Sequence, residues 1–323
     1  MNKEEARIKM NQMGKKREAF FFLSDFELEN IKLWPSDKIP DELKYDFGSL
    51  TSESNPELYE TGNCIKSVLP FPKKLYKKAF MEVQNEIHYG NTFLINLTAR
   101  SEIALNCPLL DIYYKSKAKY KLYYENRFVC FSPECFVKIK NGKITSYPMK
   151  GTIDAKVPGA EEIIMGNVKE KAEHNTIVDL IRNDVSRFAK NVHVPKFRYI
   201  QEIHSHNKSL LQVSSEICGT LDKNYHESLG DILISMLPAG SVSGAPKDKT
   251  LEIIQRVEGL KRKYYTGVAG YFDGYNLDSC VLIRFIELDQ DKYYYRSGGG
   301  ITFMSELNEE YDELIQKIYV PTH

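Results

Sequence analysis

Two stretches of this chain have the pattern of β-hairpins, in which one strand follows directly on another. Residues 126–150, NRFVCFSPECFVKIKNGKITSYPMK, alternate in character and contain the turn-forming pair Asn141-Gly142. Residues 264–288, YYTGVAGYFDGYNLDSCVLIRFIEL, form a second such pattern. Because the strands come in hairpins and do not alternate with helices, the sequence predicts an α+β fold built on antiparallel sheet.

Helical patterns separate these strands. Apolar residues at Leu75, Ala79, Val83 and Ile87 form a helical stripe that ends at Gly90. Residues 161–190 form one long helical pattern, residues 229–259 a helix, a Gly/Ser loop and a second helix, and residues 305–319 a final helix. Residues 1–70 hold only short strand-like pieces, so we expect a short N-terminal region there that packs on a domain spanning residues 71–323.

The composition excludes several classes of protein. The 323 residues include 44 Lys+Arg and 44 Asp+Glu, and this zero formal charge removes the usual electrostatic reason to expect nucleic acid or an acidic membrane surface as partner. No apolar run approaches the ~18 residues of a membrane span, and the run Phe20–Leu23 is too short for a signal peptide. We therefore expect a cytoplasmic protein whose six cysteines are reduced thiols.

Two pairs of glutamates lie at helical spacing. Glu170 and Glu173 occur in the segment KEKAEH, and Glu310 and Glu313 in EEYDELIQK. Residues three apart share one face of a helix, so each pair presents its carboxylates together. Two such pairs facing each other would make an all-oxygen site of the kind that suits Mg²⁺. Each segment taken alone is equally typical of a solvated helix face.

Small residues mark two places where a ligand can approach the backbone. The segment PAGSVSGAPK, residues 238–247, includes Ser241 and Gly244 and leads into a helix, whose N-terminal N–H groups favour an anion. It is not a P-loop, because the GxxxxGK[ST] spacing is absent. The segment RSGGGI, residues 296–301, is a second stretch of bare backbone.

Two further side chains are candidates for ligand binding. Arg284 lies within the apolar pattern VLIRF, where a guanidinium needs a carboxylate partner. Either a ligand or a structural salt bridge would provide that carboxylate. Tyr265, which precedes Gly267 by two residues, offers a hydrogen-bond donor, although any of the 21 tyrosines can serve packing alone.

Taken together, these segments resemble the chorismate-binding enzymes, a family that includes anthranilate synthase component I, aminodeoxychorismate synthase component I, isochorismate synthases and salicylate synthases. The resemblance covers roughly Leu75 to Tyr319 and rests on eight motifs in the family's order. These motifs are SPECF, PMKGT, KEKAEHNTIVDLIRND, LPAGSVSGAPK, YYTGVAGYF, LIRF, SGGGI and EEYDELIQK. The resemblance implies two antiparallel β-sheets packed as a sandwich flanked by helices, with Mg²⁺ and chorismate between them.

The resemblance also assigns roles by motif position. Glu173 and Glu313 match the principal magnesium ligands of the family, and Glu170 and Glu310 match the supporting carboxylates. The positions that hold chorismate in the family are matched by Gly151, Thr152, Ser241, Gly244, Tyr265, Arg284, Gly298, Gly299, Gly300 and Lys317.

The nucleophile distinguishes the members of the family. Members that add water resemble one another in a lysine on the strand matching TFLINLT, where this chain has the apolar Leu94. The motif PMKGT resembles the PIKGT of aminodeoxychorismate synthases, in which the lysine attacks C2 of chorismate, more than the PIAGT of anthranilate synthases. Lys150 is therefore the predicted nucleophile, and it must be neutral to react, although a free lysine with a pKa of ~10.4 is almost wholly charged at neutral pH.

Glu134, in SPECF, matches the general acid of the family. If Asn141-Gly142 forms a two-residue loop, the regular alternation of the hairpin places Glu134 and Lys150 on opposite faces of the sheet. A shared site therefore predicts either a three-residue loop or a bulge in this hairpin.

The sequence departs from the family at two motifs. Gln212 stands where the family often has His, and GTIDAK replaces GTRPRG, which removes two basic residues. The LLES signature of feedback-regulated anthranilate synthases is not found, which favours the 4-aminobenzoate and folate branch. Two alternatives stay open: anthranilate synthase component I, and a catalytically silent subunit that binds chorismate or docks an amidotransferase.

The source of ammonia implies partners. The sequence contains no GxCxGxQ glutaminase motif and no segment typical of a pyridoxal-phosphate lyase. We expect a separate glutamine amidotransferase subunit to supply ammonia and a separate pyridoxal-phosphate lyase to act on the product.

Overall fold

The computed structural model describes residues 1–48, 50–52, 62–205 and 208–322. Side chains are described for these residues except in the segment 203–208. Two compact units, each assembled from three separate stretches of chain, make up the fold. The first consists of Met1–Ile39, Glu134–Ala245 and Arg262–Val281, and the second of Pro40–Pro133, Pro246–Lys261 and Leu282–His323. Residues 1–70 thus contribute to both units, and the division into an N-terminal region of residues 1–70 and a domain of residues 71–323 stays a prediction.

The first unit is built on a nine-stranded antiparallel sheet. Its strands are β1 (Phe20–Ser24), β2 (Lys32–Pro35), β8 (Cys135–Lys140), β9 (Lys143–Ser146), β10 (Met149–Asp154), β11 (Ala189–Ser205), β12 (Lys208–Leu221), β14 (Val268–Phe272) and β15 (Leu277–Val281). Their order is β10-β12-β9-β8-β15-β14-β1-β2, with β11 paired to β12. The short strand β13 (Gly244–Ala245) also belongs to this stretch of chain.

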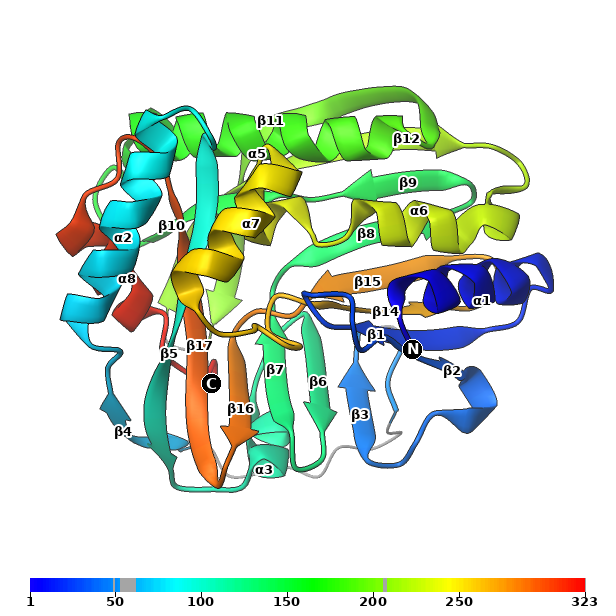
Figure 1. Ribbon diagram of the computed structural model, residues 1–323, viewed down its shortest axis with the longest axis horizontal. Helices are drawn as coiled ribbons and strands as arrows, with labels where there is room; N and C mark the ends of the chain where they lie inside the picture. Colours follow the sequence, from blue (N-terminus) through cyan, green and yellow to red (C-terminus); the bar gives the residue numbers. More distant parts are fainter. Residues whose placement is uncertain (49, 53–61, 206–207, 323) are drawn as a thin grey trace. The chain divides into compact units, whose positions relative to one another are not determined.

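Helices pack on this sheet. They are α1 (Lys3–Lys15), α4 (Ala160–Gly166), α5 (Val168–Ser186) and α6 (Leu229–Met236), with 3₁₀ turns η1 (Ser36–Lys38), η2 (Tyr225–Ser228) and η3 (Gly240–Val242). Helix α5 lies along β11 and β12, and α1 packs beside α6 (Figure 1). The single long helix expected over 161–190 is wrong, because Asn167 leaves the helical conformation and its side chain caps α5 by accepting from the Glu170 N–H.

The second unit carries its own antiparallel sheet. Its strands are β3 (Leu43–Asp46), β4 (Ile65–Leu69), β5 (Leu94–Leu105), β6 (Tyr120–Tyr124), β7 (Phe128–Ser132), β16 (Phe285–Asp289) and β17 (Lys292–Ile301). They run in the order β5-β17-β16-β7-β6-β3, with β4 paired to β5. The helices of this unit are α2 (Lys73–His88), α3 (Leu109–Lys115), α7 (Lys247–Glu258) and α8 (Leu307–Gln316).

The two sheets and their helices confirm the predicted α+β class. The segments predicted as hairpins nevertheless extend into both units, because β7 and β8 belong to different sheets, as do β15 and β16. Helix α1 was not expected; it buries Ala6, Met10 and Met13 on one face. All six cysteines lie within the described residues, and none of them forms a disulfide bond. No helix in the described parts of the chain is long and apolar enough to cross a bilayer.

Each unit has an apolar core that fixes its sheet. In the first unit all five residues of β1 are buried, and Phe20 packs against Phe272 of β14 with ring centroids 5.4 Å apart. In the second unit Ile112, Val129 and Ile286 are fully buried in one cluster. Burial of such side chains contributes about 1.5–3 kcal/mol each, so each sheet is stabilised by its own apolar core.

Candidate active site

The hairpin of β8 and β9 turns through two residues. Lys140 pairs with Lys143, and both Asn141 and Gly142 have positive φ values, 52° and 73°. This is the geometry that two-residue hairpin loops prefer, and Asn-Gly is the pair that adopts it most readily. The predicted three-residue loop is therefore wrong.

The predicted bulge is present, but it lies within β8 and not beside the turn. Between the pairs Lys138–Asp278 and Cys135–Cys280, β8 advances three residues while β15 advances two. The extra residue shifts the alternation of side chains by one position. Glu134, whose carbonyl accepts from the Val281 N–H, therefore lies on the face of the sheet that carries Ile139.

Lys150 lies on this same face. β9 and β10 pair with β12 in one uninterrupted register, from Ser146–Ile217 to Lys150–Val213. Since Ile144 lies opposite Ile139 in the hairpin, the side chains at Ile144, Ser146 and Lys150 share the face that Glu134 reaches through the bulge. The sheet of the first unit thus presents both predicted catalytic side chains to α5.

Lys150 is held by an ion pair. Its Nζ donates a 3.0 Å hydrogen bond to Oε2 of Glu173, which is only 3% exposed, and Lys169 Nζ lies 4.0 Å from the other oxygen. A solvated helix face is therefore the wrong interpretation of Glu173, because the side chain is buried against the sheet beside two cations.

Gly151 lets a second carboxylate approach the strand. It has φ 69° at a bulge between Lys150 and Thr152, the left-handed conformation that glycine adopts without strain. A Cβ atom at this position would lie 3.4 Å from Oε2 of Glu170. The backbone at Gly151 and the carboxylates of Glu170 and Glu173 therefore form one cluster around Lys150.

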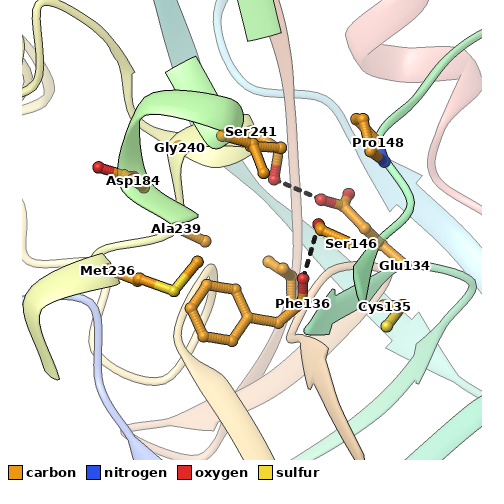
Figure 2. Close-up of a pocket in the computed structure, with 12 residues that line it drawn as sticks. Glu134, Cys135, Phe136, Ser146, Pro148, Asp184, Met236, Ala239, Gly240 and Ser241 are labelled. Carbon is orange, nitrogen blue, oxygen red and sulfur yellow. Dashed lines mark hydrogen bonds between the residues drawn. The ribbon is translucent and has the colours of Figure 1, made fainter. Parts of the chain in front are cut away.

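Glu134 lines a cavity of about 10 Å³ beneath α5. Glu134 is 8% exposed, and its carboxylate accepts a hydrogen bond from the Ser241 hydroxyl, as Figure 2 shows. Ser146 at the end of β9 and Pro148 just before β10 line the same cavity, and so does Asp184 of α5. The structure places Ser241 against the predicted general acid.

A buried polar network lies behind Lys150, and the sequence did not predict it. His174, next to Glu173, is 1% exposed, and its Nε2 lies 2.6 Å from the Ser215 Oγ, which also accepts the Arg198 N–H. Burial, together with the smaller effect of the positive charges of Arg198 and Lys150, lowers the pKa of His174 to about 4. The imidazole is therefore neutral at pH 7. The only signal in the sequence was its place inside the motif KEKAEH.

The opposite face of β12 carries two buried polar side chains whose outer atoms have no partner within the described structure. They are the Gln212 Oε1 and the Ser214 Oγ, on residues 6% and 1% exposed. Gln212 pairs with Thr152 across the ladder. Buried polar atoms without partners are costly, so both atoms destabilise the protein unless another polar group reaches them.

In the second unit, two glutamates of α8 and the lysine at its C-cap lie against the glycines of β17. A Cβ atom on Gly299 would lie 3.4 Å from Glu310 Oε2, 3.7 Å from Glu313 Oε1 and 3.8 Å from Lys317 Nζ. Lys317 pairs with Glu313 at 2.6 Å and donates to the Gly298 carbonyl at 2.7 Å. Because glycine leaves the strand bare, the carboxylates lie close against it.

The remaining candidates are distributed between the units. Gly300 pairs with Asn96 in the second unit, whereas Tyr265, 3% exposed, and Gly244 belong to the first. The description of Arg284 as part of a strand is wrong: it lies between β15 and β16 with φ 54°, and its guanidinium lies 5.4 Å from the Tyr319 ring.

The donor atoms fit a hard divalent cation. Each unit offers two glutamates at i and i+3, whose carboxylate oxygens are the ligands that such a cation prefers, and Glu173 and Glu310 are 3% and 2% exposed. Within the residues that the structure describes, no group of three or more His, Cys, Asp or Glu side chains lies close enough to hold a metal. A magnesium site formed by all four glutamates stays a prediction.

Comparison with known proteins identifies relatives of this chain. The family profile described as "chorismate binding enzyme" matches residues 25–323. An uncharacterized PabA-like protein of Haemophilus influenzae is 47% identical over 313 residues, 96% of this chain and 94% of that protein. Anthranilate synthase component 1 of Spirochaeta aurantia is 32% identical over 262 residues, and aminodeoxychorismate synthase component 1 of Bacillus subtilis 31% over 266.

These last two matches cover 76% and 77% of this chain but only 53% and 55% of the relatives, so the chain spans about half of their length. The crystal structure of anthranilate synthase component I from Streptococcus pneumoniae superposes with a TM-score of 0.66 at 26% identity, over 80% of this chain and 59% of that one.

Proposed function

Since this chain belongs to the chorismate-binding enzymes, we propose that it is the component I of an aminodeoxychorismate synthase. It converts chorismate and ammonia to 4-amino-4-deoxychorismate, the precursor of 4-aminobenzoate in folate biosynthesis. A relative of that name shares 31% identity with this chain, which is similar support to that from the anthranilate synthases. The choice between them therefore depends on the site.

The observation that carries the proposal is the position of Lys150. It lies on the sheet face that also carries Glu134, and it is half-buried and paired with Glu173. The bulge in β8 brings the buried carboxyl group of Glu134 to the face of the sheet that carries Lys150. A structural or solubilising role of the lysine gives no reason for this arrangement. The arrangement supports a nucleophile and a proton donor that act on one substrate.

The chemistry proceeds in two stages. In the first, the neutral amine of Lys150 forms a bond to C2 of chorismate and becomes a secondary ammonium, the two ring double bonds shift, and the C4–O bond breaks. Glu134 gives a proton to the departing hydroxyl, which leaves as water. In the second, ammonia bonds to C4, the two double bonds shift back, and the bond from C2 to nitrogen breaks, so that Lys150 leaves as the neutral amine. The ammonium group formed at C4 returns one proton to the Glu134 carboxylate.

Other groups prepare the substrate for these steps. Glu170, Glu173, Glu310 and Glu313 would hold Mg²⁺, which when bound supplies positive charge for the ring carboxylate. The bare backbone at Gly151 and Gly299 gives the ring room to approach. Leu94, 1% exposed at the start of β5, cannot activate water, and this disfavours isochorismate or salicylate formation.

The ammonia comes from a separate glutamine amidotransferase subunit, and a separate pyridoxal-phosphate lyase forms 4-aminobenzoate. Ammonium ion at high concentration therefore substitutes for glutamine in an assay of the isolated protein. The product separates the two aminating enzymes. A fluorescent aromatic product formed without added lyase identifies an anthranilate synthase, and no magnesium-dependent turnover at all identifies a silent subunit.

The decisive experiment is intact-protein mass spectrometry after incubation with chorismate and Mg²⁺ but no ammonia. The wild type is expected to gain the mass of chorismate less one water, and digestion should locate the adduct on Lys150. Lys150→Met should gain nothing, whereas Lys156→Met, which removes an exposed lysine from the same strand-end segment, should behave as wild type. Turnover with ammonium but without any adduct on Lys150 would refute the lysine mechanism.

A further inference from the structure

Ser241, whose motif position suggests a contact with substrate, contacts a side chain of the protein itself. Its hydroxyl donates a hydrogen bond to the carboxylate of Glu134, and both residues line the cavity of about 10 Å³ drawn in Figure 2. That volume admits one water molecule at most. The Ser241 hydroxyl therefore takes the place of bulk water as a donor to this carboxylate.

The loop that carries Ser241 is fixed on both sides. Gly240 packs so closely on α5 that a Cβ atom there would lie 2.7 Å from Leu180 Cδ2. Arg262 donates to the Val242 carbonyl at 2.7 Å, and the Ser243 hydroxyl donates to the Ala239 carbonyl at 3.0 Å. The serine hydroxyl is thus held in place by its own backbone.

The groups around Glu134 determine what this contact does. A donated hydrogen bond stabilises the ionised carboxylate and so favours loss of the proton. Besides Glu134, the residues that line the cavity include one charged side chain, Asp184 of α5, and one further titratable side chain, Cys135. The segment 239–241 adds no charged or titratable side chain. The negative charge of Asp184 opposes ionisation, so the serine is the lining group that favours the charged form of Glu134.

We propose that Ser241 is a positioning residue of the proposed amination reaction, which acts on Glu134 and does not bind chorismate. It holds the Glu134 carboxyl group toward the face of the sheet that carries Lys150, and it sets how readily Glu134 releases its proton. This inference rests on the proposed function, in which Glu134 protonates the departing hydroxyl.

The proposal is tested by pH profiles of kcat and by the KM for chorismate, measured with ammonium as the nitrogen source. The general acid must be protonated, so turnover falls as the pH rises through its titration. In Ser241→Ala the donor is lost, and this limb of the kcat profile should move to higher pH while the KM for chorismate changes less than about twofold. Ser241→Thr keeps a hydroxyl and should keep the limb where the wild type has it.

A second measurement does not depend on turnover. Infrared difference spectra of protein labelled with ¹³C-glutamate, wild type minus Glu134→Gln, follow the protonation of Glu134 without substrate. Ser241→Ala should show this carboxyl protonated up to a higher pH than in the wild type.

The outcomes separate the two claims. A raised KM with an unmoved limb would assign Ser241 to chorismate binding and overturn the inference, and so would an unmoved infrared titration. Full turnover by Glu134→Gln would instead overturn the role of Glu134 in the proposed function, whatever Ser241→Ala does.

Discussion

Nζ of Lys150 and Oε2 of Glu173 lie 3.0 Å apart, so one buried carboxylate is shared between the predicted nucleophile and the predicted metal site. The pair stabilises the charged form of the lysine, whereas a nucleophilic amine must be neutral. Glu173 therefore links the reactivity of Lys150 to whatever else binds the carboxylate. This makes Glu173 the most informative position in the first unit.

Glu173→Gln removes the negative charge and keeps the shape of the side chain. We expect magnesium-dependent turnover to fall by at least about 100-fold, because the amide no longer provides an anionic ligand. Isothermal titration with Mg²⁺ alone should show weakened binding even in the absence of substrate. Glu161→Gln, on the exposed face of α4, is the matched control and should change neither quantity. Unchanged magnesium binding in Glu173→Gln would remove this residue from the metal site.

Gly151→Ala tests the bare backbone beside Lys150. Alanine at φ 69° costs about 1–2 kcal/mol of strain, and its Cβ would also lie 3.4 Å from Glu170 Oε2. The matched control is Gly142→Ala, with φ 73° and no atom within 4 Å of the added Cβ. Urea denaturation should show a similar loss of stability in both variants. Only Gly151→Ala should lower kcat/KM, and equal kinetic effects would show that strain alone is responsible.

The buried His174 predicts how stability depends on pH. Its pKa is lowered from 6.5 to about 4, chiefly by burial, so the folded state keeps the imidazole neutral while the unfolded chain takes up a proton below pH 6.5. This contribution is complete above pH 6.5 and is lost as the pH falls toward 4. From pH 7 to 4.5 the metal-free protein should lose about 2–3 kcal/mol of unfolding free energy through this group.

The comparison is with His174→Asn, measured by urea denaturation over the same pH range. The variant has no imidazole to protonate, so its stability should fall less steeply with decreasing pH, whatever its stability at pH 7. Parallel pH dependences for the two proteins would contradict the assignment of a neutral buried imidazole.

Local patterns were enough to predict most of the secondary structure. The stripe from Leu75 to Ile87 gave α2, and the pair Asn141-Gly142 gave the turn of the β8–β9 hairpin. Each of these depends on residues adjacent in the chain. Helix α1 was missed although its buried Ala6, Met10 and Met13 have helical spacing, because the surrounding positions are strongly polar.

Features that depend on pairing between distant parts of the chain could not be predicted from such local patterns. The bulge in β8 depends on β15, where the Ser279 hydroxyl donates to the Val137 carbonyl from 142 residues away. The left-handed backbone at Arg284 comes where the chain passes from one sheet to the other, and the alternation of VLIRF gives no sign of it. Because a shared site requires Glu134 and Lys150 on one face of the sheet, the sequence nevertheless predicted an interruption of the regular alternation of side chains between them.

Gln212 offers a test in which stability and activity change in opposite directions. Its Oε1 is buried without a partner within the described structure, so the amide destabilises the protein unless a ligand engages it. Gln212→Leu removes that polar atom at similar volume and should raise the free energy of unfolding by about 1 kcal/mol. If chorismate also reaches this face of β12, which is opposite the one that carries Lys150, the same change should lower kcat/KM for chorismate by about tenfold, the equivalent of one hydrogen bond of ~1.4 kcal/mol. Gln212→His restores the side chain that the family often has and should keep kcat/KM within a few fold of the wild type.

Denaturation curves and ammonium-dependent kinetics on the three proteins provide the comparison. A leucine variant with greater stability and full activity would show that this face of β12 does not contact chorismate.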